Sequence, residues 1–257
     1  MSITLLLHFP VLNGAYKAAA TVINLNVPQI PFDLYGLGVP AILTFIDRDV
    51  ILARAGLAAS VVDFGSACLN PVQDGCNYVA VLGPIPTPYG NVFFERGYVG
   101  VDVTVADKDY RVVNTHLEVK DPPIPPDLQN AQAAELIGTL AATTPANKAL
   151  VVVGDINSSP VDPPNAPYGQ FLDGGYTDVW TLRPGSLPGF TCCQLADLSN
   201  HKSILYERDD MIFSLDALAG AKKPRVLGDV VSSKTPPQGR GLWPSDHGAV
   251  AATLKFD

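Results

Sequence analysis

The stretch VVVGDINSSP, residues 151–160, joins a continuous run of β-branched residues to a Gly-Asp-x-Asn turn. Such a run is typical of a strand that is buried on both faces of a sheet. Asp155 and Asn157 follow at the end of this strand, where binding and catalytic side chains are often placed. Asp and Asn after a Gly are also common in ordinary turns, so this stretch alone leaves both interpretations open.

Three further segments place a polar group beside an apolar run in the same way. They are VVNTHLEV (112–119), ERDDMIFS (207–214) and WPSDHGAVAATL (243–254), and they hold two of the four His residues of the chain. Such a set of side chains suits a site that holds a divalent cation and a phosphate and activates water. The four segments together supply His116, Asp155, Asn157, Asp210, Asp246 and His247.

These segments resemble the signatures of the endonuclease/exonuclease/phosphatase superfamily, which read NTHL, GDFN, R-I-D-Y-I-F and SDH in that order. The chain has NTHL at 114–117, GDIN at 154–157, RDDMIF at 208–213 and SDH at 245–247. One such motif is weak evidence, but four in the right order and each beside a strand form a specific pattern. The resemblance covers the chain from about residue 45 to its end.

The resemblance implies a role for the first three residues of the set. His116 would donate a hydrogen bond to the scissile phosphate, Asp155 would orient or deprotonate the attacking water, and Asn157 would hold the phosphate. A buried carboxylate near a cation keeps its charge and can accept a proton from water. The structural alternative for a lone His is a hydrogen-bonded core or surface residue.

The resemblance also pairs Asp210 with His247. A carboxylate that accepts from one ring nitrogen fixes the tautomer of an imidazole and raises its basicity, so Asp210 would orient His247 against the phosphate. Asp246 would bind the cation directly or through water, because hard carboxylate oxygen suits Mg²⁺ or Mn²⁺. The alternation of residues from Ile212 back along the strand predicts that Asp210 faces the site and Asp209 faces solvent.

Two metal-site residues of the family are not found. Its members open with a strand that carries an Asn and a later strand that ends in Gln-Glu, but residues 1–45 contain no Glu and no Asn in that context. The chain therefore looks as if it begins inside the family domain, and an open cleft with exposed apolar walls is expected beside the site. Glu118 is an alternative ligand, although carboxylates at strand ends are usually solvated. Arg96 either reaches a phosphate or lies at the surface.

Composition fits one large domain over residues 1–257, and we expect a monomer. Hydrophobic residues make up 47%, which is enough for a sizeable core. The net charge of −8 gives no long-range basic field that would attract nucleic acid, although a bound cation can supply positive charge locally. No stretch reaches the ~18–20 apolar residues that a membrane helix needs.

Four Cys residues are present, and no spacing among them suggests zinc. Cys68 and Cys76 bracket a polar turn and can close a small disulfide loop, whereas a bond between the adjacent Cys192 and Cys193 would strain the backbone. The alternative is four buried thiols. An even number of Cys is a hint of an oxidising compartment, so the location stays open with a secreted or periplasmic one favoured.

The strand and helix patterns predict a mixed α/β or α+β domain. Successive strands are expected at 78–82, 99–105, 110–117, 149–153, 206–215 and 249–256, and residues 15–20 could end a helix. Residues 127–142 show an approximate helical stripe with Asp127 as N-cap. The resemblance sharpens this prediction to a DNase I-like fold, a two-sheet mixed β-sandwich flanked by helices.

The sequence therefore predicts a hydrolase of phosphodiester or phosphomonoester bonds that depends on Mg²⁺ or Mn²⁺. Its partner would be a phosphorylated substrate: a nucleic acid, a phospholipid or a sugar phosphate. The alternative is a truncated, catalytically silent chain that at most binds phosphorylated ligands, which the missing Asn and Glu favour.

Overall fold

A computed structural model describes residues 14–33, 40–87, 90–120, 124–185, 187–235 and 241–256. One eight-stranded mixed sheet forms the centre of the fold, in the order β11-β12-β10-β9-β8-β5-β4, with β3 paired to β8. Its strands are β3 (Ala59–Val61), β4 (Pro71–Val72), β5 (Gly75–Asn77), β8 (Gly97–Val105), β9 (Lys108–His116), β10 (Ala149–Asp155), β11 (Thr177–Asp178) and β12 (Asp210–Ser214).

Three antiparallel pairs complete the described strands. They are β1 (Tyr16–Asp33) with β2 (Pro40–Arg54), β6 (Leu82–Thr87) with β7 (Gly90–Phe94), and β13 (Leu218–Leu227) with β14 (Ala249–Phe256). The helices are α1 (Pro126–Thr143) and α2 (Pro167–Asp173), with short 3-10 turns at Gly65–Ala67, Val179–Leu182 and Val231–Ser233. Among the described helices, none has both the length and the apolar character needed to cross a membrane.

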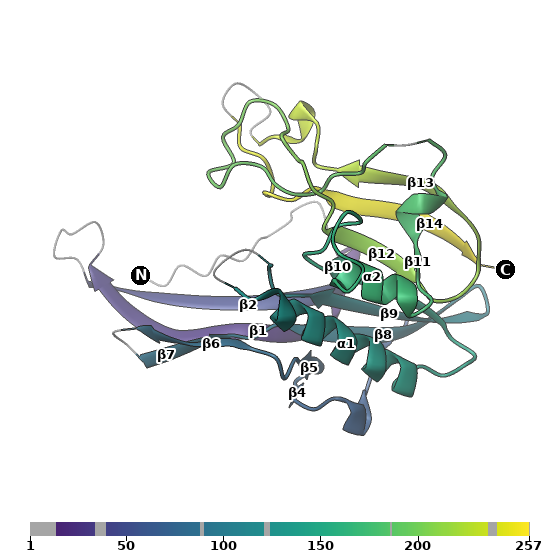
Figure 1. The fold of residues 1–257 in the computed structure, drawn as a ribbon, viewed down its shortest axis with the longest axis horizontal. Coiled ribbons are helices and arrows are strands. Elements are labelled where there is room, and N and C mark those ends of the chain that lie inside the picture. The colour runs from purple at the N-terminus through teal and green to yellow at the C-terminus, as the bar shows by residue number, and fades with distance from the viewer. Residues whose placement is uncertain are drawn as a thin grey trace.

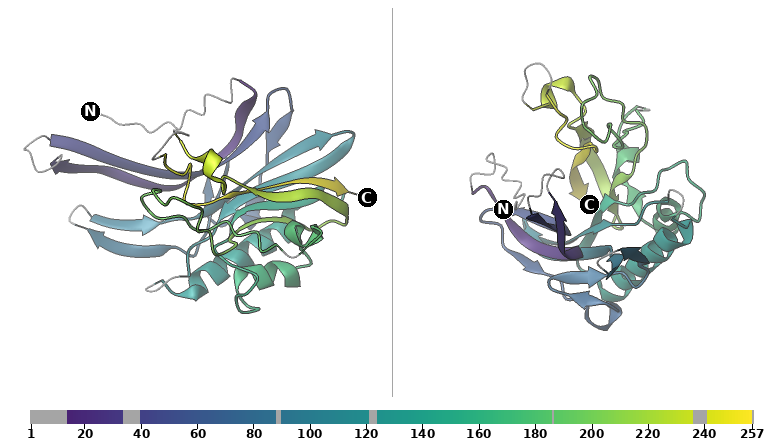
Figure 2. Two further views of the ribbon diagram at one scale, coloured as in Figure 1. Left: turned by 90° about the horizontal axis from the view of Figure 1, so that it is seen from above. Right: turned by 90° about the vertical axis from the view of Figure 1, so that its left-hand side faces the viewer.

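The two faces of the central sheet carry separate cores. Helix α1 packs on one face, where Leu136 and Leu140 join Val113 of β9 and Val152 of β10 in a buried cluster. The hairpin β1–β2 packs against the other face through a smaller cluster that includes Val22 of β1 and Val99 and Val101 of β8. Figures 1 and 2 show the helices on one side of the sheet and the hairpins β1–β2 and β13–β14 on the other.

This architecture confirms the predicted mixed fold and corrects several local expectations. Residues 15–20 do not end a helix, because Tyr16 already begins the long strand β1. The strand expected at 78–82 is absent; β5 ends at Asn77 and β6 begins at Leu82. Pro125 is the N-cap of α1, so Asp127 lies in the first turn instead. The disulfide Cys68–Cys76 is present, with a Cα–Cα distance of 5.8 Å.

Gly154 explains why the motif begins with Gly. It has a φ of +145°, and a Cβ added there would overlap the carbonyl oxygen of Thr115 on the neighbouring parallel strand. The absence of a side chain therefore lets β9 and β10 stay paired up to the site.

We expect Gly154→Ala to lower the free energy of unfolding by about 3 kcal/mol, because the backbone must shift to relieve the overlap. Gly138→Ala is the matched control, since its added Cβ would have no neighbour within 4 Å and Ala in a helix stabilises by about 1 kcal/mol relative to Gly. Urea denaturation of both variants measures the contrast. An unchanged midpoint for Gly154→Ala would show that the strand pair tolerates the side chain.

Candidate active site

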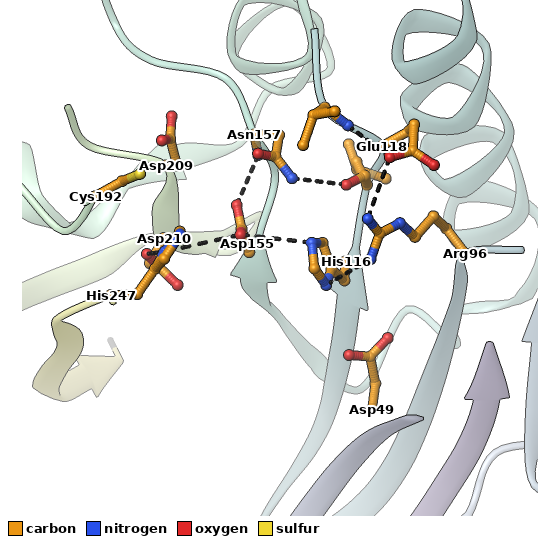
Figure 3. Close-up of polar contacts among 12 residues, drawn as sticks. Asp49, Arg96, His116, Glu118, Asp155, Asn157, Cys192, Asp209, Asp210 and His247 are labelled. Carbon is orange, nitrogen blue, oxygen red and sulfur yellow. Dashed lines mark hydrogen bonds and ion pairs between the residues drawn. The ribbon is translucent and has the colours of Figure 1, made fainter. Parts of the chain in front are cut away.

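Three of the predicted residues lie in one row across three neighbouring strand ends. Strand β10 runs parallel to β9 and places Asp155 opposite His116, and it runs antiparallel to β12 and places Asp155 opposite Asp210. Directly opposed residues point to the same face of a sheet. Figure 3 shows these side chains together with His247, which comes from the loop before β14.

Asp155 lies between the two imidazoles. Its Oδ2 is 3.5 Å from Nε2 of His116 and 3.8 Å from Nδ1 of His247. Its Oδ1 accepts a hydrogen bond of 2.9 Å from the backbone N–H of Asn157, which fixes the carboxylate in a tight turn. Burial, and then the negative charge of Asp210, raise the pKa of Asp155 to about 6. Such a carboxylate is ionised at neutral pH and is still basic enough to take a proton.

His247 is held by Asp210, as the resemblance implied. Nδ1 of the ring lies 2.8 Å from Oδ2 of Asp210. This hydrogen bond, with the charges of Asp210 and Asp155, raises the pKa of His247 to about 9. The Thr191 hydroxyl accepts from the backbone N–H of Asp210, and the Thr191 carbonyl accepts from Gly248, so both partners are anchored to one segment.

The raised pKa of His247 predicts how stability depends on pH. Its folded pKa of about 9 exceeds the ordinary value of 6.5, so its contribution is fully present below pH 6.5 and is lost as the pH rises through about 9. Asp210→Asn removes the first cause of the shift. We expect the variant to lose stability relative to the wild type at pH 6 and to approach it at pH 10, measured by urea denaturation. A pH-independent difference would contradict the assigned ion pair.

His116 is neutral, in contrast to His247. Burial, the neighbouring Arg96 and the charged His247 lower the pKa of His116 to about 3. Nη1 of Arg96 lies 3.1 Å from Nδ1 of His116 and can only donate, so the neutral ring carries its proton on Nε2, toward Asp155. His116 is therefore oriented as a hydrogen-bond donor into the site.

Arg96 and Glu118 form an ion pair behind His116. Nη2 of Arg96 lies 3.2 Å from Oε1 of Glu118, and Arg96 also lies 3.5 Å from Asp47 of β2. The expectation that Glu118 is solvated is wrong, because the residue is 2% exposed and its backbone is held by two Gln side chains of α1. Arg96 is partly buried and holds the ring of His116 in place. The alternative that it lies only at the surface is therefore wrong.

Asn157 joins the ends of two strands. It has a φ of +47°, which Asn tolerates better than most residues, and its Nδ2 donates to the carbonyl of Leu117 at 2.8 Å. This contact ties the loop after β10 to the residue after β9. Its location beside Asp155 is compatible with phosphate binding, and that role stays a prediction.

Asp246 and Asp209 differ from the other acids. Asp246 is exposed at the rim next to His247, and its Oδ1 accepts from the hydroxyl of Ser245 at 3.3 Å. Cation binding by Asp246 stays a prediction. The expectation that Asp209 faces solvent is wrong: it is 4% exposed, its backbone N–H donates to the hydroxyl of Thr191, and its carbonyl accepts from the N–H of Ile156. Burial raises the pKa of Asp209 to about 7.

Two further polar residues reach the site from β1 and β2 and carry no sequence motif. Nδ2 of the buried Asn24 donates to Oδ2 of Asp49 at 2.7 Å, and Oδ1 of Asn24 has no hydrogen-bond partner among the described residues. Burial raises the pKa of Asp49 to about 6, and the charge of Asp155 adds to this shift. Figure 3 shows Asp49 below His116 and Arg96, with its carboxylate directed toward them. The only sequence signal was an Asp inside an apolar strand.

Similarity to known proteins is found in structure and not in sequence. No family model and no curated protein matches the sequence. Truncated Caenorhabditis elegans TDP2 is similar in structure, with a TM-score of 0.54 at 14% identity over 96% of this chain and 77% of that one.

Two solved structures from Bacteroides thetaiotaomicron are also similar. The mannosyl-6-phosphatase Bt3783 has a TM-score of 0.56 at 16% identity and covers 81% of this chain and 71% of its own. An endonuclease/exonuclease/phosphatase family protein has a TM-score of 0.55 at 16% identity, covering 82% and 70%. The DNase I-like prediction is therefore confirmed, and the chain has the fold of the endonuclease/exonuclease/phosphatase superfamily.

Proposed function

We propose that the chain is a phosphoester hydrolase in which water attacks phosphorus. The observation that supports this most directly is the carboxylate of Asp155, which lies between a neutral imidazole and a protonated one. Such a group can accept the proton of a water molecule while two neighbouring donors face the oxygens of a phosphate. The named activities of the similar structures, a mannosyl-6-phosphatase among them, fit the same reaction class.

Each residue of the chain would have one task in this reaction. Asp155 orients the water and takes its proton, and His116 donates its Nε2–H to a phosphate oxygen. His247, kept protonated by Asp210, supplies a charged donor whose Nδ1–H is held by Asp210 and whose Nε2–H would face the substrate. Arg96 keeps His116 in the tautomer that donates. These donors would stabilise the charge distribution of the phosphate in the transition state more than in the anionic ground state, which is the basis of the acceleration.

The acidic residues of the site fit a hard divalent cation. Asp49 and Asp155 both have pKa values raised by burial and by mutual or neighbouring negative charge, so positive charge beside them is favourable. Oxygen ligands of this kind suit Mg²⁺ or Mn²⁺, and we propose Asp49 and Asp155 as holders, with Asp246 reaching from the rim. A bound cation would neutralise the negative charge that develops on the phosphate.

The net charge of the chain favours small substrates over long nucleic acids. The chain has a net charge of −8, so long nucleic acids gain little from its overall field. We propose a small phosphomonoester or phosphodiester, with sugar phosphates and phospholipid headgroups as the first to be tried. A chain that binds these compounds and does not turn them over would be the silent alternative.

Metal dependence tests the proposal. The pure protein should hydrolyse a generic aryl phosphodiester with Mg²⁺ or Mn²⁺, and EDTA should reduce the rate by at least about 100-fold. We expect Asp49→Asn to raise the cation concentration needed for half-maximal rate about tenfold, whereas Asp173→Asn, an exposed acid at the end of α2, should not. EDTA-insensitive hydrolysis would contradict the cation, and binding without hydrolysis would leave only the silent alternative.

A further inference from the structure

A second group of ligand atoms adjoins the candidate active site. The sulfurs of Cys192 and Cys193 and a ring nitrogen of His247 all lie within 4.8 Å of one another. Sγ of Cys193 is 3.8 Å from Nε2 of His247. Because Nδ1 of the ring is bonded to Asp210, Nε2 is the nitrogen that faces Cys193.

Backbone hydrogen bonds on both flanks of the Cys pair hold it beside His247. Cys192 exchanges hydrogen bonds of 2.9 Å with Glu207, which joins it to the chain just before β12. On the other side, the N–H of Gln194 donates to the carbonyl of Asp246 at 2.8 Å. The two Cys residues therefore lie between the segments that carry Asp210 and His247, and their sulfurs are held beside the ring by the fold.

The donor set has the chemistry of a site for a soft cation. Thiolate and imidazole are the ligands that Zn²⁺ and Cd²⁺ prefer, whereas Mg²⁺ and Mn²⁺ prefer oxygen. Zn–S and Zn–N bonds in a tetrahedral site place S and N roughly 3.6 Å apart. The observed 3.8 Å between Cys193 Sγ and His247 Nε2 is close to this value.

We propose that Cys192, Cys193 and His247 form a binding site for a thiophilic divalent cation when the two Cys residues are reduced. They are joined to each other in the structure, so binding requires a prior two-electron reduction. A small dithiol supplies it: the S–S bond breaks, both sulfurs take protons, and the dithiol becomes a disulfide. Coordination then releases the two thiol protons and the Nε2 proton of His247.

A cation at this site would inhibit the proposed hydrolase. This part of the inference rests on the proposed function. A soft cation at Nε2 of His247 removes the nitrogen that would face the phosphate. Mg²⁺ at the carboxylates would therefore support turnover. Cd²⁺ or Zn²⁺ at the neighbouring Cys and His site would block turnover in the reduced protein.

Cd²⁺ binding to the whole chain without substrate tests the site independently of catalysis. Protein reduced with a dithiol and freed of it should bind Cd²⁺ with thiolate charge-transfer absorption, and the oxidised protein should not. Cys193→Ser should weaken binding at least about 100-fold, since even indirect partners of a metal site typically contribute 10–100-fold. Cys68→Ser/Cys76→Ser is the matched control, because it removes the other pair and should retain the absorption.

The outcomes separate the site from the proposed function. Equal Cd²⁺ binding by Cys193→Ser and the wild type, or loss of the signal only in Cys68→Ser/Cys76→Ser, would overturn the site. Inhibition is then measured with Mg²⁺ present: Cd²⁺ should inhibit the reduced wild type and spare Cys193→Ser, whose own turnover should remain. Inhibition of both alike would overturn the link to His247, whereas absent turnover with intact Cd²⁺ binding would contradict only the hydrolase.

Discussion

Asp155→Asn is expected to lower kcat/KM for Mg²⁺-dependent phosphodiester hydrolysis by about 10³-fold or more, because it removes both the proton acceptor and a cation-holding carboxylate. The thermal stability of the same variant should not fall. Burial raises the pKa of Asp155 to about 6, so its ionisation destabilises the fold as the pH rises through that value. At pH 7 the variant should therefore have a Tm equal to or above that of the wild type.

Asp197→Asn is the control for this result. Asp197 lies in the exposed loop after the Cys pair and bonds only to its neighbour Ser199 among the described residues, so its loss should affect neither rate nor Tm. Steady-state kinetics and thermal unfolding of the three proteins give the comparison. A rate for Asp155→Asn within a few-fold of the wild type would remove Asp155 from the reaction.

His247→Gln should reduce kcat by about 10²–10⁴-fold, the range typical of a proton-donating group. Gln retains hydrogen-bonding capacity but cannot carry the positive charge that Asp210 maintains on the imidazole at neutral pH. The loss should therefore appear in kcat more than in KM, since the charge acts on the transition state.

His201→Gln is the matched control, because His201 is an exposed His in a neighbouring loop. It should leave kcat unchanged. Equal losses in His201→Gln and His247→Gln would point to a general effect of replacing a His, and turnover by His247→Gln at the wild-type rate would contradict the role of the charged ring.

The row of site residues could be predicted from sequence because local patterns fix it. The apolar run before Gly154 predicts a buried strand, and the motif order places a polar group at the end of each neighbouring strand. Strands β9 and β10 end at His116 and Asp155, and the antiparallel strand β12 begins at Asp210, so the three residues are paired at one edge of the sheet. Gly154 allows this pairing to continue to the last residue.

The remaining site residues depend on contacts between distant parts of the chain. Asn24 and Asp49 meet across the β1–β2 hairpin, beside an irregularity in pairing between Ile23 and Leu25 that no local pattern announces. Glu118 is buried with Arg96 as its charge partner, and a rule about solvated strand ends cannot anticipate a partner 22 residues away. Such pairings are decided by tertiary packing, which outweighs local preference.

A double-mutant cycle on Asp155 and His247 tests most directly the claim that these segments build one reaction centre. The wild type, Asp155→Asn, His247→Gln and the double variant are compared on one aryl phosphodiester with saturating Mg²⁺. Groups that act on the same water and phosphate have non-additive effects, so the double variant should be within about tenfold of the slower single variant. Rates that fall by the product of the two single effects, or a wild type without turnover, would contradict the account.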